Sequence, residues 1–360
     1  MISFKCPGGV YNAIPGRILF GRGSLKDVAG EVEHLGGKKA LVISTPGRKP
    51  LAERTAALIG GSCVGILPEA VSQVPIELAI EGRKKVREMG ADCLVAVGGG
   101  AAVGLAKGIA YEVKLPIINI ATTYSGSEVT GFCGMTIDGV KQMHISLNML
   151  ASTLIYDPEL TLSLPVKVSA ASAMNALAHC VDAVYVSTVN PVVAIAAAEG
   201  AKHVFEAAPA VAAAPDDIEA RERLLLGSYL AGIALTGGFA LQHGLAHVLG
   251  GTFHIEHGLA HALVLPYVAA FHARRVPAAL VPIAAALKTD VSDLGGAIYD
   301  MRAKLGLPSS LRETGFAEKD LDKLVRITIE TDNGYNPVPV TEEAVSEIVA
   351  QMWGGERPRR

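Results

Sequence analysis

Strand-forming and helix-forming patterns are distributed unequally along this chain of 360 residues, and that asymmetry limits its fold. In the first half, short runs rich in Val and Ile alternate with segments of helical periodicity. The predicted strands are Arg17–Phe20, Ala40–Ser44, Cys63–Leu67, Cys93–Val97 and Pro116–Ile120, and the helices between them include Leu51–Ile59 and Ile76–Met89. Strand, helix and strand at this spacing predict a parallel sheet covered by helices on both faces.

From about Leu160 onward the strand signals stop, and Ala-rich segments with helical periodicity replace them. The predicted helices are Ser169–Val186, Val192–Val211, Ile218–Leu235, Gly258–Arg275, Val291–Leu305 and Glu318–Glu330. A chain of this length is typical of two domains. We therefore predict an α/β domain over residues 1–157 and an all-helical domain over residues 158–360, with the boundary near Asp157-Pro158.

Composition narrows the class of protein and its compartment. The net charge is −3, and the terminal Arg357-Pro-Arg-Arg360 is the one basic run, so nucleic acid is not an expected partner. The N-terminus lacks a basic region followed by an apolar stretch, and no window approaches the ~18 apolar residues that span a membrane. The five cysteines are scattered without a C-x-x-C pair, which suits a reducing cytoplasm; they are Cys6, Cys63, Cys93, Cys133 and Cys180.

A glycine-rich turn follows the strand Cys93–Val97. It reads Gly98-Gly99-Gly100-Ala101 and leads directly into a predicted helix, Ala102–Tyr111. Glycines let the backbone approach a pyrophosphate closely, and the N–H groups at the start of the helix favour its charge. The turn is not the G-x-G-x-x-G fingerprint, and a glycine-rich turn also has a structural explanation.

The loop after the next strand, Ala121–Thr130, is dense in hydroxyl groups. In open α/β sheets such loops face the ligand crevice, although hydroxyl-rich loops are also common turn formers. Two consecutive strand ends of this kind predict a nucleotide site. Its candidate residues are Gly98, Gly99, Gly100, Ala101, Thr122, Thr123, Ser125, Ser127 and Thr130.

Half of the ten histidines lie in the nineteen residues from His243 to His261. The pairs His243/His247 and His257/His261 have i,i+4 spacing, and so do Asn175 and His179 further upstream. On helices each pair projects from one face. Gly250-Gly251 between the two histidine pairs is expected to break the helix and turn the chain back. A single such pair is as often an ordinary buried group, but three pairs together predict a reactive site.

Several of these motifs, in order along most of the chain, resemble the iron-containing (group III) alcohol dehydrogenase superfamily. They are Val97-Gly-Gly-Gly100, Thr122-Thr123 with Ser127–Thr130, Tyr156–Thr161 with Leu164-Pro165, Asn175–His179, and the stretch His243–Pro266. Within the superfamily the chain is most similar to the maleylacetate reductase branch. That similarity includes Ala178-His-Cys180, Tyr124–Ser127, Gly104–Lys107 and Ser44-Thr45-Pro46.

The resemblance implies a ligand position that has changed. Metal-dependent members of the superfamily carry Asp where this chain has Asn175, and they combine it with positions matching His179, His243 and His257. An Asn carbonyl is neutral and is a weak ligand for Fe(II) or Zn(II). We therefore expect a reaction that requires no metal. A metal-dependent alcohol or polyol dehydrogenase with Asn175 as a ligand remains the alternative.

Other details bear on the cofactor and the substrate. No acidic residue follows the strand that ends at Ser44, so nothing there would repel a 2′-phosphate, and NADH and NADPH are both expected to serve. Two features depart from the maleylacetate reductase pattern. Ala101 replaces the usual Ser after the three glycines, and Gln142–Asn148 replaces a basic stretch after Lys141.

The resemblance implies NAD(P)H-dependent reduction of maleylacetate to 3-oxoadipate in the breakdown of aromatic compounds, by a cytoplasmic homodimer. Hydride addition to the electron-poor alkene makes an enolate, which needs a hydrogen-bonding or cationic pocket and then a proton. His247 is expected to donate or relay that proton. His179, His243 and His257, with Asn175 beside them, are expected to bind the carboxylates of a small dicarboxylate, and Lys141 is expected near the cofactor or substrate charge unless it is a surface lysine. A lyase of the dehydroquinate synthase type and a non-catalytic nucleotide-binding protein are less favoured alternatives.

Overall fold

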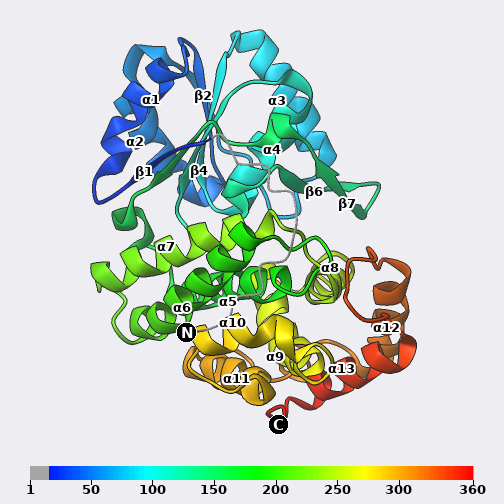
Figure 1. Cartoon of the computed structure of the whole chain (residues 1–360). Helices are drawn as coiled ribbons and strands as arrows, with labels where there is room; N and C mark the ends of the chain where they lie inside the picture. The colour runs from blue at the N-terminus through cyan, green and yellow to red at the C-terminus, as the bar shows by residue number, and fades with distance from the viewer. Residues whose placement is uncertain (1–15, 360) are drawn as a thin grey trace. The chain divides into compact units, whose positions relative to one another are not determined.

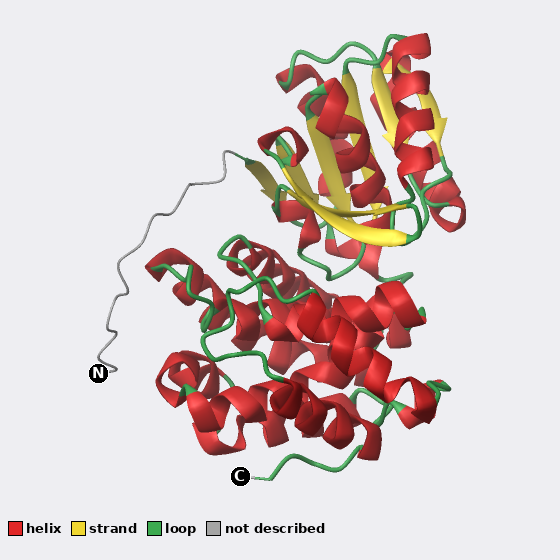
Figure 2. Cartoon of the chain, turned by 90° about the vertical axis from the view of Figure 1, so that its right-hand side faces the viewer, coloured by secondary structure: helices red, strands yellow, loops and turns green. Residues whose placement is uncertain are grey.

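The structure is a computed structural model that describes residues 16–359 (Figure 1). Cys6 lies outside these residues. Contacts within the chain separate two compact units, an α/β unit that ends at Leu164 and a helical unit that begins at Pro165. Figure 2 shows strands in the first unit and helices throughout the second. The predicted fold class, a parallel α/β domain followed by an all-helical domain, is confirmed.

The α/β unit contains a six-stranded parallel sheet with the order β1-β8-β5-β4-β2-β3. Its strands are β1 (Arg17–Phe20), β2 (Ala40–Ile43), β3 (Cys63–Leu67), β4 (Cys93–Gly98), β5 (Ile117–Ala121) and β8 (Thr153–Tyr156). The first five correspond to the predicted strands. The sixth, β8, is four buried residues without alternation of polar and apolar side chains, and the sequence analysis did not predict it.

Helices cover both faces of this sheet, as the sequence predicts. They are α1 (Val28–His34), α2 (Lys49–Ile59), α3 (Ile76–Met89) and α4 (Gly100–Val113). Alternate residues of one strand enter different hydrophobic clusters: Leu41 and Ile43 pack with α3 and α4, whereas Ala40 and Val42 pack with α1 and α2. Strands buried on both faces are typical of parallel sheets, and this explains their nearly continuous apolar sequences.

A separate antiparallel hairpin lies between β5 and β8. It is formed by β6 (Phe132–Ile137) and β7 (Val140–Ile145). Asp138 and Gly139 connect the strands, both with positive φ, of 50° and 75°. An Asp-Gly pair in this conformation is the typical two-residue hairpin turn, so the sequence did contain the signal for this hairpin.

The helical unit contains nine α-helices among the described residues, and no strand follows Tyr156 there. The helices are α5 (Val166–Ala183), α6 (Pro191–Ala213), α7 (Ile218–Leu235), α8 (Leu241–Phe253), α9 (His257–Arg275), α10 (Pro277–Ala286), α11 (Leu294–Lys304), α12 (Leu321–Glu330) and α13 (Glu342–Gly354). The sequence analysis gave no range for α8, α10 and α13, although it expected His243 and His247 to lie on a helix. Within the described part of the chain, none of the helices combines the length and apolar character needed to cross a membrane.

The chain reverses between α8 and α9, but not at the position that the sequence suggests. Gly250 and Gly251 lie inside α8, so the predicted break there is wrong. Helix α8 ends at Phe253, and the next residue, His254, has a φ of 59°. Glu256 then caps α9 by accepting hydrogen bonds from the N–H groups of Gly258 and Leu259. Glycine weakens a helix by only about 1 kcal/mol, and burial of the α8 residues around Gly250 can offset that cost.

Candidate active site

The glycine-rich turn lies where β4 joins α4. Gly98, the last residue of β4, pairs with Ala121 of the neighbouring strand β5, so the glycine turn and the hydroxyl-rich loop begin side by side. The helix starts at Gly100 rather than at Ala102, which places Gly100 and Ala101 in its first turn. Backbone N–H groups at such a helix start can bind a phosphate.

The three glycines differ in their backbone conformation and in the space beside them. Gly98 has a φ of +154°, and a Cβ on Gly99 would lie 2.6 Å from Cγ2 of Thr123. Packing within the protein therefore accounts for the absence of side chains at these two positions. A Cβ on Gly100 would meet no protein atom within 4 Å. Gly100 is exposed, so the space beside it is open to a ligand.

The hydroxyl groups of the second loop differ in what they bind. Thr122 is completely buried, and its Oγ1 bonds to no other group of the described structure. Ser125 donates to a carboxylate oxygen of Glu128 over 3.1 Å. Thr130 donates to the carbonyl oxygen of Ser127 and accepts from Lys107 Nζ at 3.2 Å. The Thr130 hydroxyl thus holds the loop together.

Lys107 connects helix α4 to this loop. Its Nζ also donates to the carbonyl oxygens of Ser127 and Phe132, at 2.6 and 2.9 Å. The residue is fully buried, and this burial lowers its pKa to about 8. Glu128 is also buried, which raises its pKa, although its carboxylate accepts a hydrogen bond from Tyr156 at 2.8 Å. Lys107 and Glu128 are positioning residues that sequence reasoning did not assign.

Two further predicted residues also lie in the α/β unit. Ser44 follows β2 directly, is fully buried, and donates its hydroxyl hydrogen to the carbonyl oxygen of Thr45. Lys141 is half-buried on β7, and burial lowers its pKa. Its side chain lies so close to Gly134 that a Cβ there would overlap it. Lys141 is therefore not a freely exposed surface lysine.

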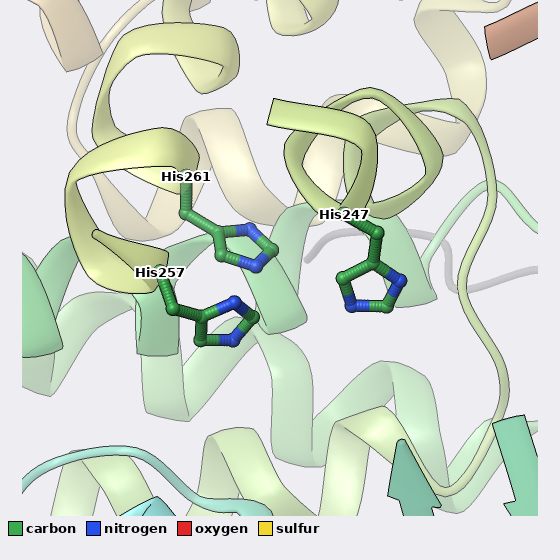
Figure 3. Close-up of side chains that lie close together, drawn as sticks. All are labelled: His247, His257 and His261. Carbon is green, nitrogen blue, oxygen red and sulfur yellow. The ribbon is translucent and has the colours of Figure 1, made fainter. Parts of the chain in front are cut away.

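Five histidines from three helices form the core of the candidate site in the helical unit. This histidine cluster consists of His179 from α5, His243 and His247 from α8, and His257 and His261 from α9. Ring centroids are 5.0 Å apart for His179–His243, 5.8 Å for His243–His247 and for His247–His257, and 4.6 Å for His243–His261 and for His257–His261. Figure 3 shows three of these side chains, with His257 and His261 projecting from α9 toward His247.

The remaining predicted residue, Asn175, lies one turn before His179 on α5 and is 3% exposed. His179, His243 and His261 are also buried, whereas His247 and His257 are partly exposed. His254, which lies between the two histidine pairs in the sequence, is exposed in the turn between α8 and α9 and is not part of the cluster. Burial, together with the neighbouring rings of His243 and His257, lowers the pKa of His179 well below 6.5.

Close helix packing brings these side chains together. Gly258, next to His257, contacts the backbone of α5 so closely that a Cβ would lie 2.8 Å from the carbonyl of Ala171. The apolar residues of α8 and α9, such as Leu245 and Leu263, are buried in one hydrophobic cluster with residues of α12 and α13. The histidines therefore occupy the polar side of helices that the hydrophobic core holds in place.

A buried aspartate that the sequence analysis missed orients one of the histidines. Asp182, on α5, is completely buried, and its Oδ2 lies 2.5 Å from Nδ1 of His243. The same oxygen accepts hydrogen bonds from the backbone N–H groups of Ala240 and His243, at 2.9 and 3.3 Å. Asp182 thus caps the N-terminus of α8 from another helix and directs Nε2 of His243 away from itself.

The acidity of Asp182 reflects these contacts. Burial alone would raise its pKa, but the hydrogen bond and charge of His243 and the N–H of Ala240 lower it below its ordinary value of 3.8. Its spacing from His179 is i,i+3, so it extends the Asn175/His179 pattern by one further turn. That helical spacing could have placed Asp182 on the same face of α5 as His179, but it could not reveal the contact with His243.

Family comparisons agree with this architecture. A model described as iron-containing alcohol dehydrogenase matches residues 15–158, and one described as the C-terminal part of the Fe-containing alcohol dehydrogenase family matches residues 169–353. The chain belongs to the iron-containing alcohol dehydrogenase family. It is therefore an oxidoreductase of that family, and it is similar to maleylacetate reductases.

Individual relatives cover almost the whole chain. A maleylacetate reductase from Rhizobium sp. (strain MTP-10005) is 40% identical over 97% of this chain and 99% of its own. The crystal structure of maleylacetate reductase from Agrobacterium tumefaciens is 39% identical, covers 98% of this chain and 100% of its own, and has a TM-score of 0.92. Sulfoacetaldehyde reductase from Bifidobacterium kashiwanohense, in complex with NAD⁺, is 25% identical, covers 96% of this chain and 99% of its own, and has a TM-score of 0.89.

The family name raises the question of a metal. The set that the resemblance implies, Asn175 with His179, His243 and His257, lacks the anionic ligand. Among the described residues, the imidazoles whose ligand atoms lie within 4.8 Å of one another are instead His247, His257 and His261.

Three imidazoles can hold Zn(II). In His261, however, Nδ1 lies 3.1 Å from the amide nitrogen of Gln242 and is already engaged in a hydrogen bond. These residues do not reproduce the one-carboxylate, three-imidazole set of the family.

Proposed function

We propose that this protein is an NAD(P)H-dependent maleylacetate reductase that converts maleylacetate to 3-oxoadipate. The observation that carries the proposal is the cluster of five converging imidazoles, beside which Asn175 stands where metal-dependent relatives have a carboxylate. Full-length similarity to maleylacetate reductases supports it. A nicotinamide cofactor is supported by the family and by the NAD⁺-bound relative, and the open space at Gly100 suits its pyrophosphate.

The chemistry proceeds in two steps. The hydride of the nicotinamide forms a C–H bond with the alkene carbon β to the ketone, and the π electrons move onto the ketone oxygen to give an enolate. The enolate then takes a proton at the α carbon, which gives the saturated ketone and leaves NAD(P)⁺. Imidazoles can stabilise the negative charge and supply the proton near neutral pH.

Residue roles follow from exposure and contacts. His247 is partly exposed and lies against His243 and His257, so it can exchange a proton with water and pass it to the substrate. His179, His243 and His257 would bind the substrate carboxylates. Asp182 supports this role by fixing the orientation of the His243 ring through its hydrogen bond to Nδ1.

One assay tests the proposal against its alternative. Oxidation of NADH or NADPH should be fast with maleylacetate, and reduction of NAD⁺ or NADP⁺ by simple alcohols or polyols should be slow. A protein that prefers alcohols and needs added Fe(II) or Zn(II) would instead be a metal-dependent alcohol dehydrogenase, the candidate that the grouping of His247, His257 and His261 favours.

A further inference from the structure

His261 occupies the centre of the histidine cluster, although sequence reasoning gave it no role. Its ring centroid lies 4.6 Å from those of His243 and His257 and 6.2 Å from those of His179 and His247. It therefore contacts rings from all three helices of the cluster. The residue has no exposed surface, so its polar atoms depend on partners inside the protein.

The hydrogen-bond partner of His261 determines where its hydrogen lies. Nε2 of Gln242 is 3.1 Å from Nδ1 of His261. An amide nitrogen can only donate, so Nδ1 accepts, and the hydrogen of the neutral ring must be on Nε2. That Nε2 is buried and bonds to no other group of the described structure. His261 thus has a buried N–H donor that has no acceptor among the described residues.

The surroundings of His261 keep this donor uncharged. Burial, and then the rings of His243, His257, His247 and His179, lower the pKa of His261 well below 6.5. These rings face it from α5, α8 and α9. The buried carboxylate of Asp182 is bonded to His243, and none of the groups that shift the pKa of His261 raises it. No neighbouring anion therefore favours a cationic His261, and a ring that stays neutral can donate a hydrogen bond without transferring its proton.

We propose that His261 is the neutral hydrogen-bond donor to the substrate oxygen on which negative charge develops, and that Gln242 sets its tautomer. This proposal rests on the reductase function, because that oxygen is the ketone oxygen that becomes the enolate. His261 keeps its proton throughout the reaction, and the α carbon is protonated by another group. A neutral donor binds the enolate more strongly than the ketone, which is the condition for lowering the barrier rather than only improving substrate binding.

Two variants of His261 test the catalytic part of the proposal. His261→Leu removes the donor and should lower kcat by roughly 10²–10³, the usual effect of losing one oxyanion donor, with a smaller change in KM. His261→Gln keeps an N–H donor and should recover much of that loss. The melting temperature of each variant establishes that it is folded. Folded His261→Leu protein with the kcat of the wild type would overturn the proposal.

A spectroscopic measurement tests the tautomer without any substrate. In protein labelled with nitrogen-15 in histidine, the signal that disappears in the His261 variants should show a neutral ring with hydrogen on Nε2 at pH 7. Gln242→Glu replaces the donor with an acceptor, so it should shift the hydrogen to Nδ1 or charge the ring, and it should lower kcat while leaving NADH affinity unchanged. A cationic ring or an Nδ1 hydrogen in the wild type overturns the assignment.

The two kinds of failure can be distinguished. If the wild-type protein does not reduce maleylacetate, the reductase function fails, and the role of His261 at the enolate fails with it, whatever the tautomer. If the wild-type protein is active and the His261 substitutions leave kcat unchanged, the reductase function stands and the inference about His261 alone is wrong.

Discussion

Asp182→Asn is the substitution whose effect can be worked out most directly from the contacts. Asparagine has almost the same shape as aspartate and keeps a side-chain oxygen, but it has no charge. In the native protein one oxygen of Asp182 accepts three hydrogen bonds, two from the backbone at the start of α8 and one from the His243 ring. The substitution therefore removes the charge and leaves the packing nearly intact.

The expected loss of stability follows from the number of bonds. A hydrogen bond to a charged group contributes about 1.5–3 kcal/mol and a neutral one about 0.5–1.5 kcal/mol, so losing the charge costs about 1 kcal/mol for each bond. Three bonds give roughly 2–4 kcal/mol. For a unit of this size the corresponding fall in melting temperature is roughly 5–15 °C.

The assay is thermal or urea unfolding at pH 7, where the wild-type carboxylate is ionised. Because the pKa of Asp182 is lowered in the folded protein, its contribution to the free energy of unfolding is present above pH 3.8 and is lost as the pH falls through the lower, folded value.

The matched control is Asp217→Asn. Asp217 caps α7 through the N–H groups of Glu219 and Ala220, at 3.0 Å each, near solvent, and Asn is an equally good cap there. Equal, small losses in the two variants would refute the argument for a buried charged cap.

Three other predictions concern the cofactor, the proton and the metal. Gly100→Ala should weaken NADH binding while leaving the melting temperature unchanged, because its Cβ meets no protein atom and would enter the phosphate space; unaltered NADH affinity in titrations would place the phosphates elsewhere. His247→Ala should lower kcat by roughly 10²–10⁴ with little change in NADH affinity, whereas His243→Ala and His257→Ala should mainly raise KM for maleylacetate; a wild-type kcat in the first variant would contradict its role in proton transfer. EDTA should leave the activity unchanged, since Asn175 supplies no anionic ligand; loss of activity that Fe(II) or Zn(II) restores would show that a metal is needed.

The regular parts of the fold were the parts that the sequence could predict. Strands β1 to β5 follow from their apolar runs, and β2, β4 and β5 are apolar throughout because they are buried on both faces. The sequence analysis missed β8, whose four buried residues form a strand by pairing with β1 and β5. The Gly250-Gly251 pair misled because tertiary packing, rather than helix propensity, keeps α8 continuous.

The candidate site was predictable to the extent that its members share a helix face. The i,i+4 pairs identified all five clustered histidines together with Asn175, and four of these histidines were assigned a role. Asp182 and Gln242 act on histidines of other helices, and no spacing in the sequence reveals a contact between α5 and α8 or between α8 and α9. His261 was recognised as part of a pair, but its central position depends on how α9 packs, so the sequence could not assign its role.

Gly258 limits which positions can be changed to alter the substrate range of this protein. Because the backbone of α9 contacts α5 directly at this residue, the spacing between His257 or His261 and His179 is set by two main chains and not by replaceable side chains. A larger residue at position 258 would separate the helices and change the distances from both His257 and His261 to His179 at once. Variants intended for new substrates should therefore keep this glycine and change the partly exposed side chains around His247, where each substitution acts locally.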